Sequence, residues 1–204
     1  MIGTHDLPLF VLSALLLNIT PGPDTLYIVG RSSTQGFKAG AVAALGIGAG
    51  IMVHVAAAAL GLSAILAASA EAFSVLKLAG AAYLVYVGIS LMRFRGASAN
   101  APAPGRATLR TVFVQGFWTN VLNPKVALFF LAFLPQFVDP AAENRMLAFL
   151  ALGLLFNLNG TLWNLFVAWS AARVGRSLGH SVWFNRTVGA LFVYLGARLA
   201  LSER

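Results

Sequence analysis

Six long apolar segments occupy most of this 204-residue chain. A helix needs about 20 mostly apolar residues to cross the hydrocarbon core of a bilayer. On that scale we predict membrane spans over residues 7–29, 40–67, 72–92, 111–137, 146–171 and 184–202. Only 10% of the residues are charged, against about 25% in soluble proteins. The chain is therefore predicted to be an all-α integral membrane protein.

Two of these segments are interrupted by prolines and polar residues. The interrupting sequences are Asn18-Ile19-Thr20-Pro21-Gly22-Pro23-Asp24 and Asn120-Val121-Leu122-Asn123-Pro124-Lys125. Proline has no N–H and clashes with the preceding turn, so we expect both helices to break there. In lipid, an unpaired backbone group costs several kcal/mol, so such a break survives only beside protein or a hydrated cavity. Both breaks are therefore expected to face the inside of the protein.

The two breaks occupy similar positions in two halves of the chain. Residues 1–95 carry three predicted spans, and residues 110–204 carry three more. Residues 96–109 begin with Gly, Ala, Ser and Pro and are predicted to be a flexible cytoplasmic linker. Because each half has an odd number of spans, the second half must enter from the opposite face. We predict two inverted three-helix repeats forming one transporter unit, as in several secondary carriers.

The basic residues in the loops predict the orientation of the chain. With the N-terminus outside, nine loop Lys and Arg residues fall on the cytoplasmic side and three on the other side. Cytoplasmic loops carry an excess of Lys and Arg, so both termini are predicted to be non-cytoplasmic. The formal charge of +8 is spread over short gaps rather than gathered on one face, so no nucleic-acid partner is expected.

The two interrupting motifs, with Gln115-Gly116-Phe117 and Pro135-Gln136-Phe137, resemble signatures of the lysine exporter and threonine/homoserine efflux (LysE/RhtB) family. Chain length, number of spans and linker position also fit, so the resemblance covers nearly the whole chain. It implies a bacterial inner-membrane protein that exports amino acids or related small metabolites. It also implies that the proton gradient supplies the energy and that no cofactor is used.

Asp24 and Lys125 are the charged members of the two motifs. A single charge near the bilayer interior costs on the order of 3 kcal/mol on insertion scales. Their similar places suggest that they approach each other between the halves. In one hypothesis they form a pair whose opening or protonation accompanies transport, and in another Asp24 binds the ammonium of an amino acid and Lys125 its carboxylate. A static ion pair, or an Asp24 that reaches the cytoplasmic interface, is the structural alternative.

Other polar residues inside the apolar segments are further candidates. To the substrate or ion path we assign Asn18, Thr20, Pro21, Gly22, Pro23, Asp24, Asn120, Asn123, Pro124 and Lys125. For the first motif, a purely structural kink is the alternative. His54 is a candidate proton relay because histidine titrates near neutral pH, or else a structural residue bonded to a neighbouring helix. Asn157, Thr161 and Asn164 share one helical face and either line a cavity or bond to other helices.

Missing residue types exclude several other functions. The chain has no cysteine, and its three histidines have no metal-ligand spacing, so no metal site is expected. Gly46-Ile47-Gly48-Ala49-Gly50 lies inside an apolar segment and fits close helix packing rather than nucleotide binding. The sequence has no His-Glu-x-x-His motif, and we predict that the protein is not an enzyme. The alternatives to an amino-acid exporter are an efflux carrier for another small solute or cation, or a non-catalytic membrane scaffold.

Overall fold

The structure of this chain is a computed structural model that describes residues 3–62, 105–139 and 141–174, with isolated positions between 75 and 93 and between 186 and 200. Within these ranges the secondary structure is helical, apart from one antiparallel bridge between Thr4 and Val138. The predicted all-α class is confirmed. Most of the linker 96–109 and of the spans 72–92 and 184–202 lies outside the described residues, so the six-helix inverted repeat stays a prediction.

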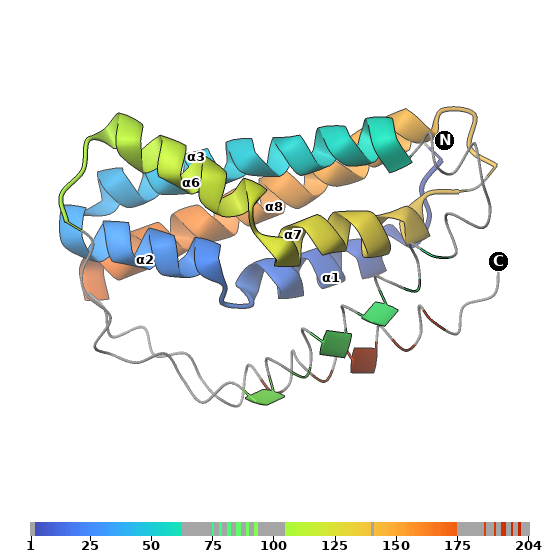
Figure 1. Ribbon diagram of the computed structural model, residues 1–204, viewed down its shortest axis with the longest axis horizontal. Coiled ribbons are helices and arrows are strands. Elements are labelled where there is room, and N and C mark those ends of the chain that lie inside the picture. Colours follow the sequence, from blue (N-terminus) through green and yellow to red (C-terminus); the bar gives the residue numbers. More distant parts are fainter. Residues whose placement is uncertain are drawn as a thin grey trace.

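Two bent helix pairs correspond to the interrupted segments (Figure 1). The paired helices are α1 (Leu7–Ile19) with α2 (Pro23–Gln35), and α6 (Leu109–Val121) with α7 (Pro124–Leu128). After α7 the chain continues through a π-helix, η2 (Phe129–Phe133), and a 3-10 helix, η3 (Leu134–Phe137). The first pair bends by 53° and the second by 45°. Both predicted interruptions are therefore confirmed, although the first segment extends to Gln35 rather than to residue 29.

Two continuous helices complete the described bundle: α3 (Phe37–Ala57), which continues as a π-helix, η1 (Ala58–Leu62), and α8 (Arg145–Val174). By length and composition, residues Phe37–Gly61 and Arg145–Arg173 are each able to cross a membrane. Each bent pair meets the same test if it is counted as one span. The described residues thus supply two to four candidate spans.

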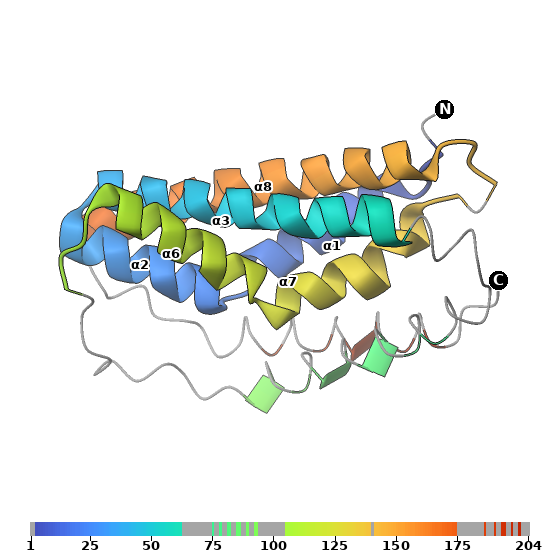
Figure 2. The same ribbon diagram turned by 45° about the horizontal axis from the view of Figure 1, so that its top comes forward.

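Glycines allow α3 to pack closely against α6, the helix beside it in Figure 2. A Cβ atom on Gly50 would lie 2.7 Å from the Phe117 carbonyl oxygen, and one on Gly46 would overlap the Phe113 carbonyl. From the other side, a Cβ atom on Gly116 would lie 2.7 Å from a backbone oxygen of α3. The predicted close packing at Gly46 and Gly50 is confirmed, and it brings the second break against α3.

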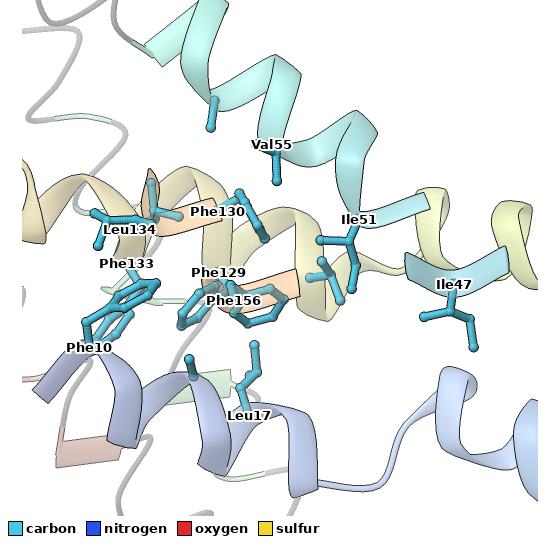
Figure 3. Packing of buried hydrophobic residues seen from close by; sticks show 14 of the residues in the cluster. Phe10, Leu17, Ile47, Ile51, Val55, Phe129, Phe130, Phe133, Leu134 and Phe156 are labelled. Atoms are coloured by element: carbon cyan, nitrogen blue, oxygen red, sulfur yellow. The ribbon is translucent and has the colours of Figure 1, made fainter. Parts of the chain in front are cut away.

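Aromatic side chains form much of the core at one end of the bundle (Figure 3). Phe129 stacks on Phe156 with ring centroids 4.9 Å apart, and Phe10 meets Phe137 edge-on at 5.2 Å. These residues come from α1, η2, η3 and α8, on the N-terminal side of the first break and the C-terminal side of the second. The breaks lie in the middle of the bundle, between this aromatic end and the end where α2 and α6 meet (Figure 1).

Candidate functional site

The Asp24 carboxylate in the first turn of α2 is bound by side chains of the second break. Its Oδ2 atom accepts a hydrogen bond from Asn120 Nδ2 at 2.9 Å and another from Asn123 Nδ2 at 3.0 Å. Both asparagines are buried, with exposed fractions of 0% and 1%. Asp24 also lies at the N-terminus of α2, where the helix dipole favours a negative charge. The charge of the first half is therefore stabilised by donors from the second half.

Lys125 in α7 belongs to the second break, and backbone carbonyl groups of the first break bind its side chain. Its Nζ atom donates to the carbonyl oxygens of Leu17 at 3.1 Å and Thr20 at 2.9 Å. In a continuous helix the Leu17 carbonyl would accept from residue 21, but Pro21 has no N–H. A Cβ atom on Gly22 would lie 3.2 Å from the Lys125 Nζ atom, so glycine leaves room for the ammonium group.

No direct ion pair forms between Asp24 and Lys125. Each charge instead has neutral partners supplied by the opposite half. The sequence offered this ion pair both as a static contact and as a pair that opens or is protonated during transport, and neither form of the pair is present in this structure. The interface-reaching Asp24 is wrong, because its carboxylate points to the second break.

Three buried polar atoms around the breaks have no hydrogen-bond partner among the described residues: Asp24 Oδ1, Asn120 Oδ1 and Asn18 Nδ2. Leaving a buried donor or acceptor unpaired costs about 1–3 kcal/mol, more for a charged group. Asn18 packs against α8, where a Cβ atom on Gly160 would lie 3.1 Å from its Oδ1 atom. The site therefore offers two free acceptors, one of them charged, and one free donor.

The other residues of the two motifs shape the backbone. The Thr20 hydroxyl donates to the Leu16 carbonyl at 2.6 Å and so completes the last turn of α1. Pro23 and Pro124 are the first residues of α2 and α7, a position where no intrahelical N–H is needed. Pro21 lies between the two helices of the first pair. Their assignment to the path of a solute or ion stays a prediction.

His54 on α3 contacts the second break. Its Nε2 atom lies 3.1 Å from the Asn120 carbonyl oxygen, so this nitrogen carries the proton in that contact. The bond to a neighbouring helix, one of the two interpretations of His54, is what the structure shows. The side chain of Asn120 binds Asp24, so Asn120 connects His54 to the buried carboxylate. A proton-relay role for His54 stays a prediction.

The polar residues of α8 lie partly against α3. The Thr161 hydroxyl donates to Asn157 Oδ1 at 3.2 Å, and both oxygens face Gly48, where a Cβ atom would be 3.0 and 3.3 Å away. Asn164 is buried with an exposed fraction of 7%. Asn157 and Thr161 thus share a face, as predicted, and that face meets α3. The cavity-lining role of all three residues stays a prediction.

Arg31 in α2 is a buried residue, although from the sequence we predicted it only as a loop charge. With an exposed fraction of 5%, it donates to Gln35 Oε1 at 3.0 Å, the Gly105 carbonyl at 2.8 Å and Gln115 Oε1 at 2.7 Å. Its guanidinium lies over the Tyr27 ring, 5.5 Å from the centroid. This network joins the end of α2 to the start of α6. No carboxylate in the described ranges pairs with Arg31.

The sequence did contain a signal for this network. Tyr27, Arg31 and Gln35 recur every four residues, which places three polar side chains on one face of a helix. Gln115 belonged to a family signature but had no assigned role. In the part of the chain that the structure describes, no three His, Asp or Glu residues lie together as metal ligands would.

Comparison with known proteins identifies relatives along the whole chain. An uncharacterized membrane protein of Pseudomonas aeruginosa is 32% identical over 98% of this chain and 97% of its own length. A leucine efflux protein of Enterobacter sp. (strain 638) is 30% identical, with 94% and 93% covered. A homoserine/homoserine lactone efflux protein of Salmonella typhi is 30% identical, with 95% of each chain covered.

No solved structure matches this chain. Residues 15–203 match the family described as LysE type translocator, and this match includes both helix breaks and all the bonds between them. The family and the relatives named as efflux proteins are transporters rather than enzymes. This membrane protein therefore belongs to the LysE type translocator family.

Proposed function

We propose that this protein is a secondary exporter of amino acids or closely related small metabolites, with its solute site between the two helix breaks. The observation that carries this proposal is the crossed binding of the two buried charges, Asp24 by the second break and Lys125 by the first. A membrane scaffold has no use for two buried charges, each of which is costly to place in a bilayer. Relatives named as amino-acid efflux proteins support the substrate class.

The ammonium group of the solute is the part we assign to Asp24. Leucine, homoserine and homoserine lactone, the solutes in the relatives' names, share an amino group, whereas the lactone has no free carboxylate. An ammonium has three N–H donors, and Asp24 Oδ1 and Asn120 Oδ1 are buried acceptors without a partner. Lys125 has used two of its three N–H groups, so the third is available for a carboxylate where the solute has one.

The proton gradient is the energy source that we propose. The sequence has no P-loop for ATP binding, so an ion gradient or the solute's own gradient must drive transport. His54 is the candidate relay toward Asp24 through Asn120. In this proposal six helices form two inverted halves, 1–95 and 110–204, in the inner membrane, with both termini non-cytoplasmic. Alternating access then arises from movement of one half against the other around the charges.

Export from loaded cells tests the proposal. Cells that express the protein are loaded with dipeptides, and the rate at which each released amino acid leaves the cells is measured. We expect faster efflux of at least one amino acid than in cells expressing the Asp24→Asn variant at equal membrane abundance. If a metal ion or sugar leaves faster and no amino acid does, the protein is an efflux carrier for that other solute.

A further inference from the structure

The C-terminal end of α1 presents two carbonyl oxygens to one point. The Leu17 carbonyl lacks its usual partner because residue 21 is proline, and the Thr20 carbonyl lies at the break itself. The C-terminus of a helix is also the negative end of its dipole. This end of α1 is therefore a site for a cation, whatever the identity of the exported solute.

Sodium ions or protons occupy such sites in other carriers. Where a membrane helix is interrupted, the freed carbonyls and the C-terminal ends of half-helices coordinate the coupling cation. Here the Nζ atom of Lys125 lies 3.1 and 2.9 Å from the two oxygens. A sodium ion on the same oxygens would lie in contact with a second positive charge, so the ammonium and the ion exclude each other.

The rest of the lysine is fixed so that it reaches this point. Asn123 caps α7 by accepting the backbone N–H of Lys125 at 3.0 Å, which sets the direction in which the side chain leaves the helix. Gly22 lies beside the ammonium, and a Cβ atom there would be 3.2 Å from Nζ and 3.5 Å from Cε. The Asn123 cap of the second break and the small residue Gly22 of the first break therefore both accommodate this side chain.

We propose that Lys125 is a tethered cation, supplied by the second half of the protein, that takes the place of a coupling sodium ion on the carbonyls of α1. It follows that the protein neither needs nor binds sodium at this site. The proposal deepens the proposed function, because it concerns the ion that accompanies transport. Its first test does not require a known solute.

Thermal unfolding of the purified full chain in detergent is that first test. The melting temperature is compared in choline, sodium and ethylammonium chloride. We expect equal values for the wild type. In Lys125→Ala we expect a drop of about 5 °C or more in choline, part of which ethylammonium restores. Lys38→Ala, which removes an exposed lysine from α3, is the matched control and should melt like the wild type in all three salts.

Two results would overturn the proposal: sodium stabilising the wild type over choline, or Lys125→Ala melting like the wild type. If Lys125→Ala does not fold, the wild-type comparison still decides, and Gly22→Ala gives a second variant. Its added methyl group crowds the ammonium, so a lower melting temperature is expected, and an unchanged one contradicts the packing.

Transport provides the second test once an exported amino acid is known. Efflux from proteoliposomes is measured with sodium replaced by choline on both sides. We expect the rate to stay within about twofold, and a loss of transport in choline would refute the tethered cation. If the proposed function is wrong, no amino acid leaves the cells or proteoliposomes. The melting temperatures still test the role of Lys125 in that case, because they do not depend on transport.

Discussion

The two helix breaks share a proline and a bend, yet they bind opposite charges. At the first break Pro21 follows the end of α1, so it removes the N–H that the Leu17 carbonyl would have used, and bare oxygens remain. At the second break Pro124 begins α7, where no intrahelical N–H is required. There Asn123 caps the helix with its oxygen and keeps its Nδ2 atom free for Asp24.

This difference shows that the position of a proline relative to a helix end decides whether the break binds a positive or a negative charge. A proline just after a helix leaves acceptors that bind a cation. A proline at the start of a helix, behind an asparagine cap, leaves a side-chain amide that binds an anion. Each break also carries the charge that the other one binds, so two crossed contacts connect the halves.

The charge swap Asp24→Lys with Lys125→Asp should have the largest effect. A lysine at position 24 would face the Nδ2 donors of Asn120 and Asn123, and an aspartate at position 125 would face two carbonyl oxygens. Leaving buried charges without partners is strongly destabilising, about 3–5 kcal/mol where one partner is lost. We expect little folded protein by size-exclusion chromatography and no efflux. Recovery of transport in the double variant would instead support a symmetric ion pair.

Asn123→Ala should have the second largest effect, because the Asn123 side chain both caps α7 and donates a hydrogen bond to Asp24. Loss of the cap costs about 1 kcal/mol, and loss of the bond to the Asp24 carboxylate about 1.5–3 kcal/mol. Asn123→Asp keeps the oxygen that caps α7 but removes the donor to Asp24. Thermal unfolding should therefore rank wild type above both variants. If Asn123→Asp melted like the wild type, the bond to Asp24 would contribute nothing.

Replacing Pro21 and Pro124 one at a time tests whether the two prolines have different roles in efflux. Pro21→Ala restores an N–H that competes with Lys125 for the Leu17 carbonyl, so we expect efflux to fall about tenfold, which corresponds to about 1.4 kcal/mol. Pro124→Ala should change efflux by less than about twofold, since the first helical N–H has no partner in the helix. Equal effects of the two substitutions would show that the prolines act only as kinks.

His54→Gln should have the smallest effect on stability. A glutamine amide can still donate to the Asn120 carbonyl, whereas His54→Ala loses that bond at about 1 kcal/mol. The relay hypothesis makes a separate prediction for function. Efflux driven by an imposed proton gradient should fall in His54→Gln, while exchange of solute across the membrane without a gradient should continue. Unchanged proton-driven efflux would leave His54 with only its structural bond.

The sequence alone determined the features that depend on local chemistry. Apolar length identified the segments able to cross a membrane, and prolines located both interruptions within a few residues of where the structure has them. The glycine spacing predicted close packing at Gly46 and Gly50, and the motifs identified the family. These inferences hold because helix length, proline chemistry and glycine size act within a few residues of the chain.

The tertiary structure alone decided which atoms meet. The sequence brought Asp24 and Lys125 together as a pair, but the bend at each break and the rotation of each helix direct them to separate partners. Asp24, His54 and Arg31 each bind a residue that lies 66 to 99 positions away along the chain. These partners lie on different helices, and the turn of 100° per residue relates only the side chains of one helix, so spacing does not show which groups on another helix they face.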